Sequence, residues 1–296
     1  MSRKTDFKAA LIRSVSELKG AHLTRETREN TMHLFAERMF ELGFVHLASA
    51  KDINGKHLKS YIEYRKGEGI AIRTMQNEMS HLRSILRHVD RHSVANAVEL
   101  KNAKLGIAGG SRIGKKTAIL DSEVDAVLAR AARLKRPGLG MCILLDRYLG
   151  LRGNEALHAR LDTLRRWEKE LKAGNVIKVV EGTKGRRPRH VVLADTETAK
   201  KIVAQAIEIA ESQNGFLITR KNGKAAGGLK QARSIYHGWF SRAGIQPHSA
   251  RYAFAQAQHA DNLHNEFSVR ESLLQVSRDL GHGSGRGRWV KSVYMR

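Results

Sequence analysis

The stretch Leu-Gly-Leu-Arg-Gly-Asn-Glu-Ala-Leu at residues 149–157 is the segment on which the interpretation of this sequence depends. It places Arg152 directly after a Gly-Leu pair and Glu155 three residues later. Taken alone, an arginine in such a block is usually a surface or ion-paired residue. Its meaning therefore depends on which other reactive or charged residues accompany it along the chain.

Four such elements follow Arg152 in the sequence. They are Thr183-Lys184-Gly185, His248-Ser249-Ala250-Arg251, Leu280-Gly281-His282 and finally Tyr294. A hairpin lysine is usually just solvated, and a tyrosine near the end of a chain is more often a packing residue than a nucleophile. The His-x-x-Arg spacing puts two side chains on one helix face, but such pairs are common. Each element is weak by itself.

The second half of the chain predicts a mixture of helices and a small amount of sheet. The runs at 175–181 and 189–193 are rich in β-formers, and the intervening GTKGRRP predicts a hairpin with a basic tip. Helices are expected at 121–133, about 138–150, 195–212, about 229–243 and from residue 248.

The first hundred residues predict a helical bundle. Met32, Phe35, Met39 and Leu42 step by three and four, as does a longer apolar stripe from Ile72 to Val89. Residues 53–64 predict a short helix between these two.

Arginines flank the longer stripe on one side. Arg73, Arg83 and Arg87 each follow a stripe residue by one position, so they project about 100° away from the apolar face. Such a flank could lie along a DNA backbone or could simply be a solvated helix face; the pattern supports both equally.

The formal net charge is +24 over 296 residues. Self-repulsion of this size is commonly offset by a polyanion, which favours nucleic acid over ribosomal or anionic membrane surfaces. Residues 101–117 combine glycines with basic residues and predict a flexible basic linker. The expected organisation is a helical domain at 1–100, this linker, and a second domain at 118–296.

Together and in this order, the five elements resemble the tyrosine recombinase family, which includes phage and mobile-element integrases. The family pattern is Gly-Leu-Arg-x-x-Glu, a hairpin lysine, His-x-x-Arg, Leu-Gly-His and a terminal tyrosine. The resemblance covers about residue 118 to the end, and less specifically the N-terminal helices. It implies a mainly α fold with a small β-hairpin: a helical core-binding domain joined to a mixed α/β catalytic domain.

The resemblance also implies a reaction. Tyr294 would attack the phosphorus and form a 3′-phosphotyrosine bond, which conserves the ester energy, so that strands rejoin without ATP or a metal. Arg152 and Arg251 would bind the nonbridging oxygens, because guanidinium forks match phosphate geometry. Lys184 would protonate the leaving 5′ oxygen.

Three further residues receive supporting roles from the same resemblance. His248 would be the acid/base partner near Tyr294, His282 would hydrogen-bond a phosphoryl oxygen, and Glu155 would orient its neighbours. DNA contacts are expected from the arginines of the helical domain and of the hairpin tip: Arg73, Arg83, Arg87, Arg186, Arg187 and Arg189. The expected partner is double-stranded DNA, with self-assembly from dimer to tetramer on it, and no cofactor is implied.

The sequence departs from the family pattern at several places. Tyr252 follows Arg251 where the family usually has histidine, and Ala250 stands where leucine is common. The segment between His282 and Tyr294 is longer than usual and glycine-rich, which predicts a mobile loop. Lys178 is a rival hairpin lysine, but Lys184 lies at the expected tip.

Other functions remain as alternatives. A non-catalytic DNA-binding regulator would not need the terminal tyrosine, and a type IB topoisomerase fits the size and the helical first half less well. A metal-dependent nuclease would need a carboxylate cluster, and Glu155 and Asp162 are too sparse for one. The single cysteine, Cys142, excludes an internal disulfide, and the N-terminus has no apolar signal core. A cytoplasmic protein with no membrane span is expected.

Overall fold

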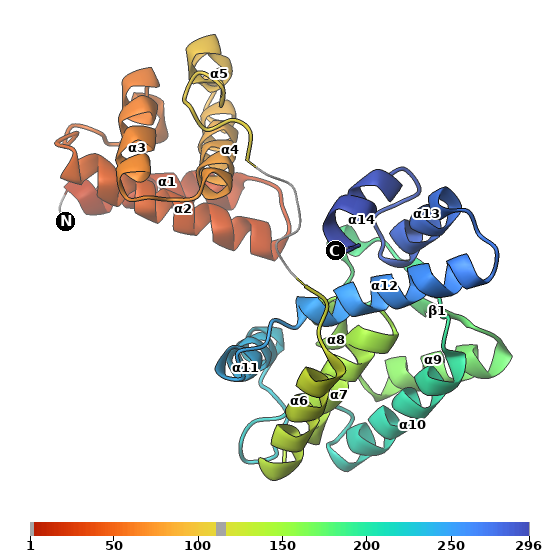
Figure 1. Ribbon diagram of the computed structural model, residues 1–296. Coiled ribbons are helices and arrows are strands. Elements are labelled where there is room, and N and C mark those ends of the chain that lie inside the picture. Colours follow the sequence, from red (N-terminus) through yellow and green to blue (C-terminus); the bar gives the residue numbers. More distant parts are fainter. Residues whose placement is uncertain (1–2, 111–116, 296) are drawn as a thin grey trace. The chain divides into compact units, whose positions relative to one another are not determined.

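The structure is a computed structural model that describes residues 3–110 and 117–295. The chain divides into two compact units, Met1–Ser111 and Arg112–Arg296. Helices dominate both units, as predicted, and a two-stranded antiparallel sheet in the second unit is the only sheet among the described residues (Figure 1).

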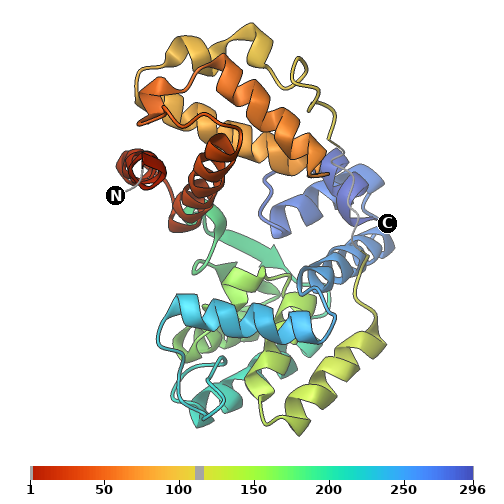
Figure 2. The same ribbon diagram turned by 90° about the vertical axis from the view of Figure 1, so that its left-hand side faces the viewer.

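The first unit is a helical bundle. Its elements are α1 (Arg3–Glu17), α2 (His22–Glu41), η1 (Ala50–Asp52), α3 (Gly55–Gly67), α4 (Ile72–His88), α5 (His92–Asn96) and η2 (Val98–Leu100). Helices α1 and α2 lie side by side in both views (Figures 1 and 2). Phe7 of α1 packs on Phe35 of α2, which in turn contacts Tyr61 of α3. The predicted apolar stripe of α4 is buried from Met75 to Leu86, but Ile72, at the first turn, is 39% exposed.

The predicted linker begins later than expected. Leu105 and Ile107 are buried in the core of the first unit. The Ile107 carbonyl accepts a hydrogen bond from Gln76 Nε2 at 2.8 Å, and Asn102 Oδ1 accepts one from Arg83 Nη2 at 2.9 Å. Residues 101–110 therefore belong to the first unit because two apolar side chains anchor them there. Residues 111–116 of the predicted linker lie outside the described residues.

The second unit contains α6 (Asp121–Arg133), α7 (Pro137–Tyr148), α8 (Gly153–Ala156), α9 (Leu161–Ala173), β1 (Val176–Val179), η3 (Lys184–Arg186), β2 (Arg189–Val192), α10 (Thr196–Ser212), α11 (Leu229–Arg242), α12 (His248–His264), α13 (Val269–Asp279) and α14 (Gly287–Tyr294). Strands β1 and β2 form the predicted hairpin, in the register Val176 to Val192 and Val179 to Arg189.

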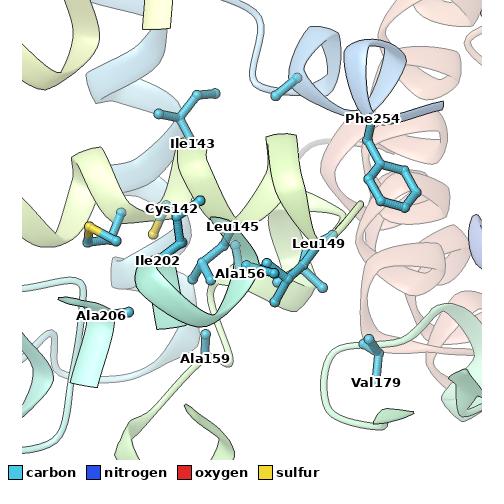
Figure 3. Close-up of a cluster of buried hydrophobic side chains, with 14 of the residues drawn as sticks. Cys142, Ile143, Leu145, Leu149, Ala156, Ala159, Val179, Ile202, Ala206 and Phe254 are labelled. Atoms are coloured by element: carbon cyan, nitrogen blue, oxygen red, sulfur yellow. The ribbon is translucent and has the colours of Figure 1, made fainter. Parts of the chain in front are cut away.

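Helix α7 lies at the centre of this unit and contacts α6, α10 and α12. It is apolar on nearly every side, as expected for a helix surrounded by other elements. Figure 3 shows Cys142 and Leu145 of α7 beside Ile202 of α10, with Phe254 of α12 over the end of α7. The chain leaves this fixed core at Leu149, so the segment that carries Arg152 starts from a rigid support.

The glycine-rich segment before Tyr294 differs from the prediction of a mobile loop. Its second half is helix α14, which buries Val290, Val293 and Tyr294 on one face. Helix α14 begins in contact with α13, since a Cβ added at Gly287 would be in ordinary van der Waals contact with Leu273 and Leu274. Tyr294 is therefore held by a helix that is packed on α13.

We predict that Gly150→Ala destabilises the second unit by about 2–5 kcal/mol, the sum of left-handed backbone strain and overpacking. Gly150 has φ +63°, and a Cβ there would lie 2.5 Å from Phe254 Cε1. The matched control is Gly174→Ala, because Gly174 is extended with nothing within 4 Å of an added Cβ. Urea unfolding followed by tryptophan fluorescence reports on this unit alone, since Trp167, Trp239 and Trp289 all belong to it. Equal stability of the two variants would contradict the prediction.

Candidate active site

The turn that follows α7 presents the first arginine. Gly150 takes up the left-handed conformation there, and Arg152 occupies the N-cap of the short helix α8. Glu155 accepts a hydrogen bond from the Arg152 backbone N–H at 2.7 Å through Oε2, and one from Arg152 Nη1 at 2.8 Å through Oε1. One carboxylate therefore caps the helix and orients the arginine side chain. The Arg152 side chain remains 21% exposed, so it can reach a ligand.

The second arginine, Arg251 of α12, is completely buried. Its Nη1 donates to the Gly150 carbonyl and its Nη2 to the Leu280 carbonyl. Burial lowers the pKa of Arg251 to about 10, with the positive charges of Arg189 and Arg152 contributing. Arg251 is therefore still a cation at neutral pH.

Glu155 supplies the negative charge among these cations. Burial raises the pKa of Glu155, but the charges of Arg189 and Arg251 outweigh burial and lower the pKa overall. The carboxylate therefore stays ionised at neutral pH and binds the arginines as an anion. Its Oε2 lies 4.0 Å from Arg251 Nη1.

The Leu280-Gly281-His282 turn connects the arginines to the tyrosine. The Leu280 carbonyl accepts hydrogen bonds from both Arg251 and Arg152, the latter at 2.7 Å. His282 is held by its backbone N–H, which donates to the Ser277 carbonyl at 2.8 Å. Its ring Nε2 lies 3.3 Å from the Tyr294 hydroxyl. One turn thus places the arginine pair and the phenol next to each other.

His282 is uncharged at neutral pH. Desolvation by burial lowers its pKa to about 3, with contributions from the positive charges of Arg251, Arg152, Arg286 and Arg189. A neutral imidazole can accept a hydrogen bond at one ring nitrogen and donate one from the other.

Tyr294 is the last residue of α14 and is 1% exposed. An aromatic cluster surrounds it, with ring centroids 4.5 Å away at Tyr252 and 5.7 Å away at Trp289. The Tyr294 carbonyl accepts a hydrogen bond from Gln256 Nε2 at 2.9 Å. Helix α14 and this cluster together hold the phenol beside His282.

His248 is the exposed first residue of α12, at the edge of this cluster. Its ring centroid lies 5.6 Å from that of Tyr252 and 6.2 Å from that of Tyr294. The structure therefore brings His248 near the tyrosine, although His282 lies closer to the hydroxyl.

Lys184 lies at the tip of the hairpin, in η3, with its side chain exposed. It makes no hydrogen bond or ion pair with any described residue, so it is not joined to the arginine pair in this structure. The rival Lys178 is in the middle of β1, paired with His190, and its backbone N–H donates to Glu170. Of the two, Lys184 is the lysine on the irregular, exposed part of the hairpin.

The predicted DNA-contacting arginines fall into three groups. Arg73 and Arg87 are exposed on α4, and Arg186 and Arg187 are exposed at the hairpin tip. Arg83 is half-buried, with its guanidinium bound to the Leu100 carbonyl and to Asn102.

Arg189 differs from the prediction. Its side chain is buried and forms an ion pair with Glu155. The basic hairpin tip predicts a DNA contact for Arg189, but the strand alternation of β2 turns its side chain inward, away from the exposed His190.

A cavity of about 590 Å³ adjoins His282. Arg187 and His190 line it from the hairpin, and Arg278 lines it from α13. The lining is strongly basic and offers room for an anionic chain beside the arginine pair.

Trp289 is a site residue that the sequence prediction missed. Its ring contacts His282 edge-on, with the centroids 4.5 Å apart, and it also contacts Tyr294. The apolar spacing of Val290, Val293 and Tyr294 is a helical signal that could have placed Trp289 beside the site. The glycines before it masked that signal.

Within residues 3–110 and 117–295, no group of three or more histidine, cysteine, aspartate or glutamate side chains is arranged to hold a metal ion. In the same ranges, no helix combines the length and apolarity needed to cross a membrane.

Two family models match the chain. The one described as Integrase matches residues 106–257, and the one described as phage integrase, N-terminal, matches residues 5–95. No curated protein matches the sequence.

Solved structures with a similar fold span nearly the whole chain. A variant of the Tn1549 transposon integrase in complex with transposon right-end DNA has 14% identity and a TM-score of 0.60, covering 99% of this chain and 95% of that one. The XerH site-specific recombinase, in a post-cleavage complex with a palindromic difH substrate, has 16% identity and a TM-score of 0.57, covering 98% of this chain and 92% of that one. At these identities the likeness establishes the fold.

We predict that Trp289→Ala raises the pKa of His282 from about 3 toward its ordinary value of 6.5, because the ring loses the neighbour that shields it from water. The four arginines remain, so the rise should be partial. Trp289→Phe should keep the low pKa. NMR titration of the imidazole nitrogens, assigned with His282→Gln, measures the shift.

The lowered pKa of His282 also makes the stability of the folded protein depend on pH. The unfolded chain protonates His282 below pH about 6.5 while the folded protein does not, so this residue causes a loss of stability as pH falls. That loss should be smaller in Trp289→Ala than in the wild type. An unchanged His282 titration in Trp289→Ala would refute the shielding role.

Proposed function

This chain belongs to the tyrosine recombinase family, and from that premise we propose that it is a site-specific DNA recombinase that cleaves and rejoins strands through Tyr294. The observation that carries the proposal is the Leu280–His282 turn. The Leu280 carbonyl accepts hydrogen bonds from Arg152 and Arg251. The ring Nε2 of His282 lies 3.3 Å from the Tyr294 hydroxyl. A phosphate binder and a nucleophile thus share one rigid support.

In the proposed reaction, the Tyr294 oxygen attacks the phosphorus and the bond from phosphorus to the 5′ oxygen breaks. The products are a 3′-phosphotyrosine and a strand with a free 5′ hydroxyl. Rejoining is the reverse reaction, in which a 5′ hydroxyl attacks the phosphotyrosine. One ester replaces another in each direction, so no ATP is consumed.

Charge neutralisation comes from Arg152 and Arg251. The pentacoordinate transition state carries more negative charge on its nonbridging oxygens than the ground state does, so preorganised guanidinium groups stabilise it selectively. Both groups are already held by the Gly150, Glu155 and Leu280 acceptors, and little reorganisation is needed when phosphate arrives.

Proton transfers are assigned to His248 and Lys184. His248 serves as the acid/base partner of Tyr294 at the edge of the aromatic cluster, whereas neutral His282, with its low pKa, hydrogen-bonds a phosphoryl oxygen. Lys184 reaches the leaving 5′ oxygen from the hairpin when DNA is bound, and donates the proton that this oxygen needs.

Duplex DNA is the proposed substrate. The net charge of +24 supplies a large nonspecific attraction to phosphates. Exposed Arg73 and Arg87 on α4, together with Arg186 and Arg187 at the hairpin, supply contacts in both units. As in the wider family, we propose that dimers and tetramers assemble on the DNA.

We predict that Tyr294→Phe binds DNA like the wild type but forms no covalent adduct, because only the attacking hydroxyl is lost. The test uses duplex DNA from the junctions flanking the gene, incubated in EDTA, quenched with SDS and resolved as shifted protein bands. An adduct on the wild type in EDTA excludes a metal-dependent nuclease. Adducts of equal amount on Tyr294→Phe would overturn the assignment, and none on the wild type would favour a non-catalytic regulator.

We also predict that Lys184→Ala slows cleavage by about 10²–10⁴-fold, as expected for a lost general acid. A substrate with sulfur in place of the 5′ bridging oxygen should restore its rate, because a thiolate leaves without a proton. Lys178→Ala is the matched control and should cleave both substrates normally. Rescue of Lys178→Ala in place of Lys184→Ala would mean that the other hairpin lysine is the acid.

A further inference from the structure

Three guanidinium groups share three acceptors in this site, and each pair has one acceptor in common. Arg152 and Arg189 both bind Glu155 Oε1. Arg152 and Arg251 both donate to the Leu280 carbonyl. Arg189 and Arg251 both donate to the Gly150 carbonyl, the former at 3.0 Å.

This closed arrangement makes the position of each guanidinium depend on the other two. Arg152 comes from the cap of α8, Arg251 from α12 and Arg189 from β2. The shared acceptors therefore join three separate elements. Arg189 adds a fourth connection, since its Nε donates to the Asp279 carbonyl at 2.7 Å.

Arg189 is poorly placed to touch DNA. It is 7% exposed, and all three of its nitrogens donate to protein acceptors. Arg251 is also buried, but its Nε donates to none of the described residues. By contrast, the Arg152 side chain is 21% exposed, and only its Nη1 and Nη2 donate to described residues, so its Nε–H remains unused. Arg152 and Arg189 therefore have different access to a ligand although they bind the same carboxylate.

We propose that Arg189 is a positioning residue for strand cleavage, which fixes Glu155, Gly150 and the end of α13 so that Arg152 and Arg251 meet the scissile phosphate in the correct geometry. This rests on the proposed recombinase function and goes beyond it by assigning a role to an arginine outside the reacting set. Its strand position also connects the arginine pair to the hairpin that carries Lys184.

Electrostatics supports the same role. Glu155 is buried, and after the opposing effect of burial the charge of Arg189 is the largest influence that lowers its pKa. Loss of Arg189 would leave the carboxylate less strongly ionised and free to shift toward Arg152 and Arg251. A displacement of about 1 Å in such a group can cost about 10²-fold in rate.

The test compares Arg189→Met, Arg189→Lys and the control Arg186→Met, which removes an exposed arginine from the same hairpin. Two quantities are measured on the junction duplex: the single-turnover rate of adduct formation at saturating DNA, and the binding constant as a function of salt. Thermal unfolding shows which variants are folded.

For Arg189→Met we expect a salt slope equal to that of the wild type and cleavage slowed by roughly 10²-fold. Arg189→Lys should recover part of the rate, because one ammonium can satisfy some of the acceptors. Arg186→Met is the reference for the loss of one DNA contact, and its salt slope should become less steep by about 0.9.

The outcomes are distinguishable. A folded Arg189→Met that cleaves normally at saturation, with a salt slope reduced by about 0.9, would make Arg189 a DNA contact and overturn the proposal. If Arg189→Met does not fold, a folded Arg189→Lys with the full wild-type rate overturns it equally. Absence of adduct on the wild type would instead count against the recombinase function.

Discussion

The burial of one carboxylate among three guanidinium groups is the constraint on which the structure of the second unit depends. Glu155 is inaccessible to solvent, and Arg152, Arg189 and Arg251 surround it. Like charges at this spacing repel, and only the shared acceptors and the single anion make the cluster stable. Its net positive charge in a protected site is well suited to a phosphodiester, whose charge grows during the reaction. The same cluster joins α8, α12, β2 and the end of α13, so the architecture and the chemistry rest on one set of contacts.

Tyr294, the proposed nucleophile, is held by a second, mostly apolar set of contacts. Tyr294 ends a helix that packs on α13, and its ring is enclosed by Tyr252 and Trp289. Enclosure keeps the phenol next to neutral His282, but it also leaves Tyr294 only 1% exposed. Attack on a phosphate therefore requires bound DNA to reach the hydroxyl or α14 to shift. The long spacer between His282 and Tyr294 supplies both the helix and Trp289, which a shorter spacer could not.

Much of this arrangement was predictable from the sequence, and the exceptions have physical causes. The hairpin and the helices around 121–133, 195–212 and 229–243 follow from local propensity and apolar spacing. Helix α14 was missed because glycines at its start suggested a loop, whereas packing on α13 stabilises the helix. The glycines and basic residues at 101–110 predict a linker. The side chains of Leu105 and Ile107, however, are buried in the core of the first unit. In both cases tertiary burial overrode composition.

The sequence by itself determined the family, because the types of Arg152, Lys184, Arg251 and Tyr294 and their order along the chain match the family pattern. That pattern also supplied the residues that we propose to react. Only the tertiary structure decided which arginines are exposed and which are buried against other residues. Arg186 and Arg189 lie in the same basic run, yet one is exposed and the other is buried against Glu155. Charge is a property of the residue, whereas access to solvent is a property of the packing around it, and no local pattern of basic residues encodes which side of a strand will be covered.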